Sequence, residues 1–121
     1  SDVANAIMDG TDAVMLSGES AVGDYPVEAV KMLARIAEEV EPAMQVINSP
    51  PKHTEDADAI SEALHAIDDT LDLQCIVAFT ETGYTARLAS GERPKAPIVA
   101  YTPDARVYCR LSLNWGVRPV L

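Results

Sequence analysis

The sequence predicts an α/β protein in which short apolar strands alternate with amphipathic helices around a mostly parallel sheet. Apolar runs typical of strands occur at residues 12–16, 75–79, 97–101 and 117–121; the first fits a strand buried on both faces, and the second a buried strand. Apolar residues three and four positions apart, typical of amphipathic helices, occupy the intervening segments. Helices between strands favour βαβ units with right-handed crossovers, so we expect parallel pairing.

Composition narrows the class of protein. A chain of 121 residues suits one domain or pieces of two, and an apolar content of 48% indicates a folded globular protein. The net charge of -10 opposes binding to nucleic acid or to anionic membranes, which need cationic patches. We find no apolar run of about 18 residues and no signal-type segment, and we therefore expect a cytoplasmic protein with no membrane partner.

The cysteines and histidines predict no metal site. Cys75 lies in an apolar run and Cys109 in an amphipathic one, so we expect two buried reduced thiols rather than a disulfide. His65 lies beside an apolar helical stripe and His53 lies next to two prolines, which leaves no pair at metal-ligand spacing.

The first third of the chain predicts a helix, a strand and a second helix. Ser1 can cap a short helix that Gly10 ends. Residues 12–16 follow as a strand, with polar residues 17–19 at its carboxyl end. A longer amphipathic helix is expected over residues 26–40, opened by a proline in its first turn.

Two adjacent prolines among small polar residues predict a boundary between two packed units. We assign residues 1–48 to the first domain, residues 49–53 to a linker and residues 54–121 to the second domain.

The second domain is expected to alternate helix and strand to its end. Its elements are a helix with the apolar stripe Ile60, Leu64, Ile67 and Leu71, a strand at 75–79, a helix from 85, a strand at 97–101, a helix at 105–113 and a strand from 117. Asp68 and Asp69 are interpreted as a solvated helix end. Trp115 is interpreted as a residue that packs a helix end against the sheet, with stacking on a ligand as the alternative. Because the last strand would be an unpaired apolar edge, we expect more chain to follow it in a parent protein.

The loop Thr80-Glu81-Thr82-Gly83-Tyr84-Thr85 follows a predicted strand and precedes a helix. Ligands of open α/β sheets bind at this end of the strands. Free N–H groups at the helix start and three threonine hydroxyls suit a phosphate. The alternative is a polar turn in which Thr82 or Thr85 caps the helix, and Glu81 counts against an anion. The loop matches neither a P-loop nor a dinucleotide fingerprint.

Ser17 and Glu19 form the second candidate site, at the carboxyl end of the 12–16 strand. A hydroxyl and a carboxylate two residues apart can hold a water or relay a proton. Alternatively, Ser17 satisfies backbone groups and Glu19 begins the next turn. Spacing alone favours this structural alternative.

Three segments resemble the pyruvate kinase family: SDVANA at 1–6, MLSGESA at 15–21 and GDYPVEAV at 23–30. The resemblance implies that residues 1–48 complete a (β/α)₈ barrel, with 12–16 as its eighth strand. Catalytic residues of such barrels lie at the carboxyl ends of strands. In this family the residues that match Ser17 and Glu19 are associated with a water-linked proton path, which reverses the preference stated above.

The resemblance also implies an activity for a full-length protein. Pyruvate kinases transfer a phosphoryl group from phosphoenolpyruvate to ADP in glycolysis, with Mg²⁺ and K⁺, as cytoplasmic homotetramers. The family's metal-binding carboxylates, phosphoryl-contacting lysine and active-site threonine would lie upstream of Ser1. We therefore expect this chain to be an inactive C-terminal piece that itself binds no metal.

The second half resembles the start of the family's allosteric C-terminal domain. The residues that match its phosphorylated-effector loop are Thr80, Thr82, Gly83, Tyr84 and Thr85. The chain departs from the family at Val22, where many members carry lysine near the nucleotide, and at Tyr84, where some animal-type members carry a basic residue. A stand-alone module that binds a sugar phosphate or nucleotide remains the alternative, and it leaves the first 48 residues without a role.

Overall fold

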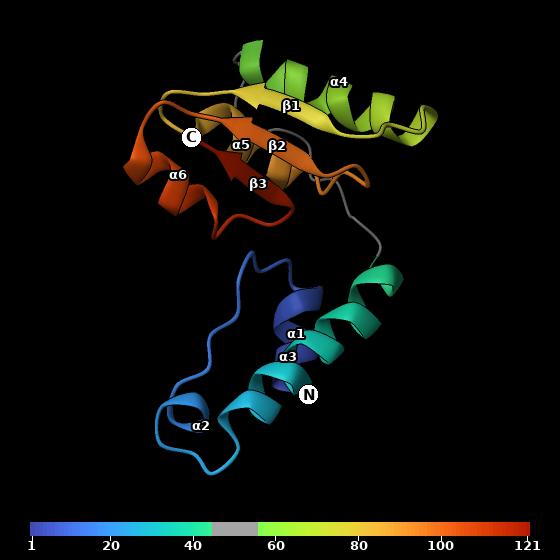
Figure 1. Cartoon of the computed structure of the whole chain (residues 1–121). Coiled ribbons are helices and arrows are strands. Elements are labelled where there is room, and N and C mark those ends of the chain that lie inside the picture. Colours follow the sequence, from blue (N-terminus) through green and yellow to red (C-terminus); the bar gives the residue numbers. More distant parts are fainter. Residues whose placement is uncertain (45–55) are drawn as a thin grey trace. The chain divides into compact units, whose positions relative to one another are not determined.

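The computed structural model describes residues 1–44 and 56–121, which fall in two compact units, Ser1–Gln45 and Val46–Leu121 (Figure 1). The predicted linker at 49–53 lies outside the described residues. The proposed domain limits therefore stay predictions.

The first unit is helical in its described part. It contains α1 (Asp2–Met8), α2 (Gly18–Ala21), α3 (Pro26–Val40) and the 3₁₀ turn η1 (Glu41–Ala43). Both α1 and α2 pack against α3. The Oγ of Ser1 caps α1 by accepting a hydrogen bond of 3.3 Å from the N–H of Ala4, and Gly10 follows the helix in the left-handed region at φ 87°. The predicted start and end of α1 are thus confirmed, and α3 has the predicted limits 26–40.

The predicted strand at residues 12–16 does not form. These residues are irregular, and the side chain of Met15 is 87% exposed. A strand exists only where a neighbour accepts and donates its backbone hydrogen bonds, and no strand of the described residues pairs with this segment. An apolar run predicts the tendency to form a strand, but the pairing partner decides whether the strand forms.

The second unit is an α/β layer with a parallel sheet, as predicted. The order along the chain is α4 (Asp56–Thr70), β1 (Ile76–Phe79), α5 (Tyr84–Gly91), β2 (Ile98–Tyr101), α6 (Ala105–Leu111) and β3 (Val117–Val120). The sheet order is β1-β2-β3 with every pair parallel (Figure 1). In the register, Ile76 lies opposite Ile98, and Ile98 lies opposite Val117.

The core lies on one face of this sheet. It consists of Ala78, Ile98, Ala100 and Val117 from the strands and Ala86, Ala89, Val107 and Leu111 from the helices. Helix α5 contacts β1 and β2, and α6 contacts β3. The alanines let backbones approach closely, and the larger side chains fill the remaining space.

The opposite face of the sheet carries apolar side chains that are exposed, so the prediction of a buried strand at residues 75–79 is wrong for Val77 and Phe79 of β1. Val77 is 52% exposed and Phe79 78%, and the ring of Phe79 stacks on Tyr101 with centroids 5.4 Å apart. The helix residues of the core cluster, Ala86, Ala89, Val107 and Leu111, pack with Ala78. Because side chains alternate between the two faces of a strand, every second residue of β1 is then exposed to solvent.

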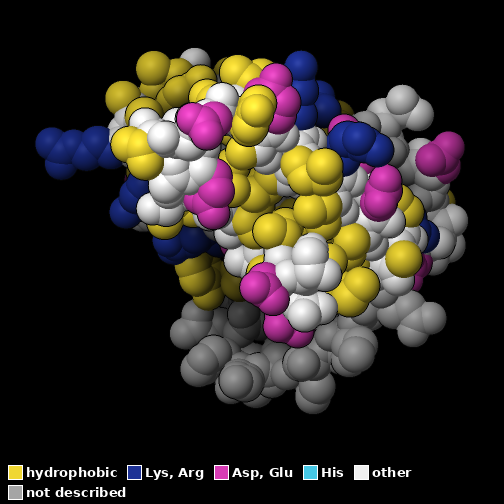
Figure 2. Space-filling view, turned by 90° about the horizontal axis from the view of Figure 1, so that it is seen from below, with side chains coloured by type: hydrophobic (Ala, Val, Ile, Leu, Met, Phe, Trp, Pro, Cys, Tyr) yellow, Lys and Arg dark blue, Asp and Glu magenta, His cyan; other side chains and the backbone are white. Residues whose placement is uncertain are grey.

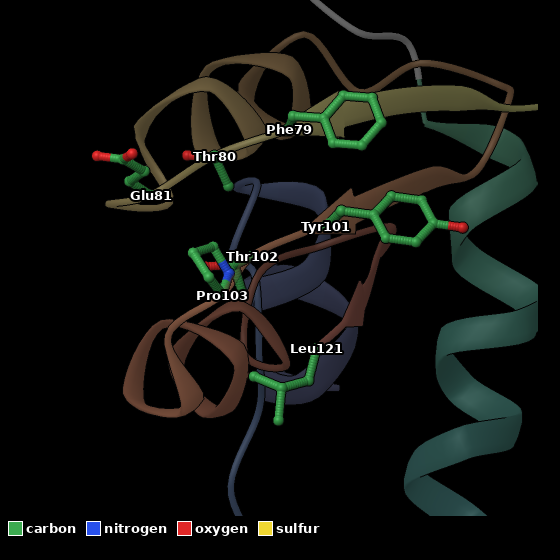
Figure 3. A pocket seen from close by; sticks show the side chains of 7 residues that line it. All are labelled: Phe79, Thr80, Glu81, Tyr101, Thr102, Pro103 and Leu121. Carbon is green, nitrogen blue, oxygen red and sulfur yellow. The ribbon is translucent and has the colours of Figure 1, made fainter.

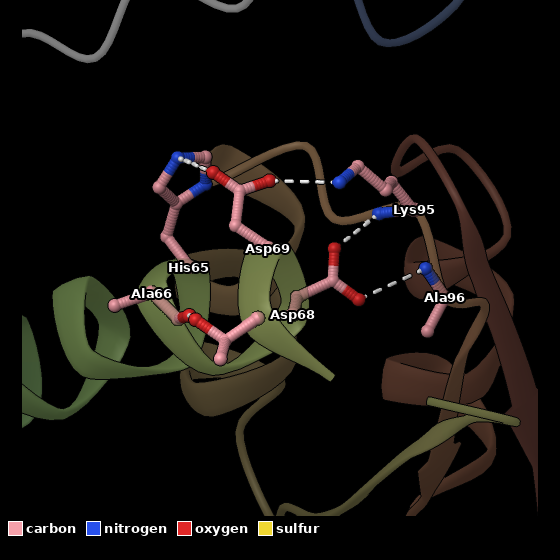
Figure 4. Close-up of polar contacts among 7 residues, drawn as sticks. His65, Ala66, Asp68, Asp69, Lys95 and Ala96 are labelled. Atoms are coloured by element: carbon pink, nitrogen blue, oxygen red, sulfur yellow. Dashed lines mark hydrogen bonds and ion pairs between the residues drawn. The ribbon is translucent and has the colours of Figure 1, made fainter. Parts of the chain in front are cut away.

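Helix α4 docks on the core differently from the prediction. Of its apolar stripe, Leu64 packs against the core, whereas Ile60, Ile67 and Leu71 are exposed. Asp68, interpreted from sequence as solvated, is only 5% exposed. Its carboxylate accepts hydrogen bonds from the backbone N–H groups of the segment that leads into β2 (Figure 4). The helix is held by a polar contact as well as by apolar packing.

Both cysteines are free, as predicted, but Cys75 and Cys109 are exposed rather than buried. Cys75 lies just before β1, and Cys109 lies on α6, whose buried positions are Val107 and Leu111. The apolar run around Cys75 did not reveal which of its residues would turn inward.

Exposed apolar side chains occur in both units. Those of the first unit include Met8, Val22, Tyr25, Val27, Val30 and Met32. Figure 2 shows hydrophobic side chains gathered on one face with Asp and Glu side chains beside them. None of the helices in residues 1–44 and 56–121 combines the length and apolar content needed to cross a bilayer.

Candidate functional site

Ser17 and Glu19 are brought together at the start of α2. The backbone N–H of Ser17 donates a hydrogen bond of 3.2 Å to the Oε2 of Glu19, and Ser17 is the N-cap residue of the helix. The Oγ of Ser17 makes no capping bond, while its carbonyl accepts from the Oγ of Ser20 at 3.3 Å. The contact is the reverse of a side-chain cap: the carboxylate reaches back to an N–H before the helix.

The same bonds hold the Glu19 carboxylate in its charged form. Backbone hydrogen bonds from Glu19 itself and from Ser17 lower the pKa of Glu19 below its ordinary value. At neutral pH the group is an acceptor of hydrogen bonds and no source of protons. It can orient a water molecule, and the free hydroxyl of Ser17 is a donor beside it.

Gly23 supports this turn in a way that sequence reasoning missed. A Cβ at Gly23 would lie 2.4 Å from the carbonyl oxygen of Glu19. Only glycine permits that approach of the two backbone segments. No local pattern in the sequence marks the contact.

The Thr80–Thr85 loop lies at the carboxyl end of β1 and leads into α5. The Oγ1 of Thr80, which is buried, accepts a hydrogen bond of 2.9 Å from the N–H of Gly83, and the Oγ1 of Thr82 accepts from Tyr84 at 3.3 Å. Gly83 has φ 85°. The loop is therefore a tight turn closed by its own threonines.

These hydrogen bonds determine which donor groups of the loop are available to a ligand. A hydroxyl that accepts an N–H still has its own proton to donate, so Thr80 and Thr82 become oriented donors. Thr85 is exposed in the first turn of α5, where backbone N–H groups lack intrahelical partners. The positive end of the helix dipole lies at the same place. Several donors thus converge at the loop, as an oxyanion requires.

Arg110 is a member of this site that the sequence did not indicate. Its Nη2 donates a hydrogen bond of 3.2 Å to the carbonyl oxygen of Thr82, 28 residues earlier in the chain. The contact depends on α6 packing under the loop, because Leu111 and Val107 lie within 3.3 Å of a Cβ built on Gly83. Nothing in the local pattern around residue 110 marks it as a neighbour of residue 82.

A hollow of about 530 Å³ adjoins the loop at the carboxyl ends of the strands (Figure 3). It is lined by Phe79, Thr80, Glu81, Tyr101, Thr102, Pro103 and Leu121. Thr102 repeats at β2 the arrangement of Thr80 at β1: it is buried, and its Oγ1 accepts from the N–H of Asp104 at 3.3 Å. Figure 3 shows the Phe79 and Tyr101 rings side by side, with Thr80, Glu81, Thr102 and Pro103 beyond the strands.

Asp69, near the end of α4, has a basic side chain on either side. Asp69 lies between His65, at 3.4 Å, and the Nζ of Lys95, at 2.9 Å (Figure 4). Lys95 lowers the pKa of Asp69, chiefly by its hydrogen bond, and Asp69 raises the pKa of Lys95 in the same way. Residues 1–44 and 56–121 bring together no group of three His, Cys, Asp or Glu side chains able to hold a metal ion.

Two family models cover most of the chain. The α/β domain of pyruvate kinase matches residues 58–121, and the barrel domain of pyruvate kinase matches residues 1–30. This chain belongs to the pyruvate kinase family. The sequence-based assignment to that family is confirmed, as is the fold class, the end of the barrel domain followed by part of the α/β domain.

Individual pyruvate kinases align over nearly the whole chain. Pyruvate kinase 2 of Synechocystis sp. is 51% identical over 100% of the chain, and pyruvate kinase of Clostridium acetobutylicum is 44% identical over 100%. The solved structure of Cryptosporidium parvum pyruvate kinase in complex with ADP matches with a TM-score of 0.85 at 37% identity over 99% of the chain. The chain spans 21%, 27% and 26% of these three proteins.

Proposed function

We propose that this chain is the part of a pyruvate kinase that contains the end of the catalytic barrel and the start of the allosteric domain, with residues 49–53 as the linker. The full-length enzyme would transfer a phosphoryl group from phosphoenolpyruvate to ADP, giving pyruvate and ATP in glycolysis. The observation that carries this proposal is the 51% identity to a pyruvate kinase over the entire chain.

Ser17 and Glu19 are the proposed catalytic residues of this segment. Phosphoryl transfer leaves the enolate of pyruvate, which must gain a proton at carbon. The carboxylate of Glu19 is held charged by backbone N–H groups, so it is suited to orient a water rather than to give up a proton itself. The Ser17 hydroxyl can both donate and accept a hydrogen bond. In this proposal it extends the chain of hydrogen bonds that begins at the water held by Glu19.

Thr80, Thr82, Gly83, Tyr84 and Thr85 are the proposed binding residues for the phosphate of an allosteric effector. The support is the loop geometry: two threonine hydroxyls oriented by accepting the N–H groups of Gly83 and Tyr84, a glycine at φ 85°, and the start of a helix directly after them. The ring of Tyr84 would stand beside the phosphate in place of a basic side chain.

The cofactors and partners proposed for the full-length enzyme follow from the family. They are Mg²⁺ and K⁺, phosphoenolpyruvate, ADP, a phosphorylated effector and the other subunits of a cytoplasmic homotetramer. The residues described here do not fit a metal centre, and no step involving metal is assigned to them. Val22, which is 88% exposed, offers no charge to a nucleotide phosphate.

A stand-alone effector-binding module is the weaker alternative. It requires no barrel segment, whereas residues 1–30 match the barrel domain of the family.

The test is a coupled assay of the full-length enzyme that carries this segment, with phosphoenolpyruvate, ADP, Mg²⁺ and K⁺. Glu19→Gln keeps the size of the side chain and removes its charge, and we expect kcat to fall by about 10²-fold or more. Glu28→Gln, which removes an exposed acidic charge from α3, is the matched control and should leave kcat unchanged.

The enzyme assignment and the catalytic role of Glu19 can be refuted independently. A full-length protein without pyruvate kinase activity would refute the enzyme assignment. An active Glu19→Gln enzyme with normal kcat would leave the assignment in place and remove Glu19 from the catalytic residues.

A further inference from the structure

We propose that Arg110 of α6 supplies the cation of the effector site, in place of a basic residue within the Thr80–Thr85 loop. This inference rests on the proposed function of that loop. It adds a side chain from a different element, and it defines the ligand group as a phosphate in its doubly charged form.

The loop by itself is a poor site for such a group. It contains no Lys or Arg and does contain the exposed carboxylate of Glu81. The chain as a whole carries a net charge of -10, so the surrounding field also repels anions. Hydroxyl and N–H donors orient an oxyanion, but two negative charges on it call for a nearby positive charge.

Arg110 meets that need by its position. Its Nη2 donates to the carbonyl oxygen of Thr82 at 3.2 Å, which anchors one edge of the guanidinium on the loop itself. A guanidinium has five N–H donors in a fixed plane, so one bond to a carbonyl leaves others for a phosphate oxygen. The side chain is exposed and therefore open to a ligand from solvent.

The packing of α6 beneath the loop holds Arg110 beside Thr82. A Cβ on Gly83 would lie 3.3 Å from both Val107 and Leu111, so the loop backbone rests directly on α6. Asp104 caps the start of α6 by accepting from the N–H groups of Arg106, at 2.7 Å, and Val107, at 3.2 Å. A side chain in the last turn of this helix is thus held at a constant distance from the loop.

The test is a titration of the 121-residue chain with glycerol phosphate, followed by the NMR signals of the Gly83, Tyr84 and Thr85 amides. We expect Arg110→Gln to weaken binding about tenfold, the usual cost of losing a hydrogen bond to a charged group. Arg110→Lys keeps the charge but loses the planar set of donors, so we expect its affinity to lie between those of the wild type and Arg110→Gln. Arg118→Gln removes an equal charge from β3, away from the loop, and should have no effect.

A purely structural role for Arg110 is distinguished by pH. The affinity of the wild type should rise as the phosphate monoester loses its second proton near pH 6, and Arg110→Gln should flatten that rise. Sulfate, whose charge does not change in this range, reports any titration of the protein itself.

Two results would overturn the inference in different ways. If Thr85→Val abolishes binding while Arg110→Gln binds with the affinity and pH profile of the wild type, Arg110 is excluded and the loop remains the effector site. If the wild type itself binds no glycerol phosphate at these amides, the proposed effector function of the loop is refuted, and the proposed role of Arg110 is refuted as well.

Discussion

The carboxylate of Asp68 at the end of α4 accepts a hydrogen bond of 2.6 Å from the backbone N–H of Lys95, 27 residues later. The other carboxylate oxygen accepts from the N–H of Ala96 at 3.3 Å. A buried side chain thereby satisfies two donors of the segment before β2 and joins α4 to the sheet (Figure 4).

Replacing Asp68 should cost more stability than replacing an exposed acidic residue near the end of α4. Asp68→Ala leaves the N–H groups of Lys95 and Ala96 without their acceptor, and we expect a loss of about 2 kcal/mol in the free energy of unfolding. Urea denaturation measures the change. Asp72→Ala, an exposed neighbour, is the control, and an equal effect of both variants would contradict the role given to Asp68.

The ion pair of Asp69 and Lys95 should make a small contribution to stability that depends on pH. The pKa of Asp69 is lowered in the folded chain, so its contribution is present above the unfolded value of about 3.9 and is lost as the pH falls through the folded pKa. The pKa of Lys95 is raised, so its contribution is present below about 10.4 and is lost as the pH rises through the folded pKa. Comparing Tm of the wild type with Asp69→Asn from pH 2 to 7 is the check. The difference in Tm between the two proteins should decrease as the pH falls. A difference that stays constant would show that the Asp69–Lys95 pair does not contribute to stability.

Gly83→Ala should destabilise the effector loop. The substitution places a Cβ at φ 85° and 3.3 Å from both Leu111 and Val107, and we expect a cost of about 1–2 kcal/mol. Gly91→Ala, at the end of the same helix, meets nothing within 4 Å and should be neutral or slightly stabilising. Thermal unfolding of the two variants compares the sites directly. Equal Tm values for them would show that the left-handed backbone at Gly83 is not required.

Gly23→Ala should disturb the turn that holds Glu19. The new Cβ would lie 2.4 Å from the Glu19 carbonyl oxygen, so the backbone after α2 must move. Gly18→Ala, at the start of α2 and with nothing within 4 Å of its new Cβ, is the matched control. The amide shifts of residues 17–23 provide the measurement: we expect large changes across this segment for Gly23→Ala and local ones for Gly18→Ala. A local response to both would mean that the turn tolerates a side chain.

Helices and strands whose signals are local could be predicted closely. The Ser1 cap, the proline that opens α3, and the strands of the second unit all lie within one or two residues of their predicted limits. Each depends on neighbours along the chain, such as a capping hydroxyl, a fixed φ or a run of apolar residues. The strand at residues 12–16 was predicted on the same grounds and is absent from the structure, because strand formation also needs a partner that sequence does not specify.

Burial was the least predictable property. Asp68 was expected in solvent and is buried, while Cys75 and Cys109 were expected inside and are exposed. A local pattern shows which residues share a face of a helix or strand, but the face that turns inward depends on the element that packs on it.

The sequence by itself determined the family, the α/β alternation and the two candidate loops, because these depend on residue identity and spacing along the chain. Only the tertiary structure decided that Thr80 and Thr82 close their own loop, that Arg110 lies on the carbonyl of Thr82, and that Gly23 lies against Glu19. The bond from Arg110 joins residues 28 positions apart, and it exists because α6 packs beneath the loop. Such contacts arise from the packing of whole elements, and for that reason no local pattern of residues predicts them.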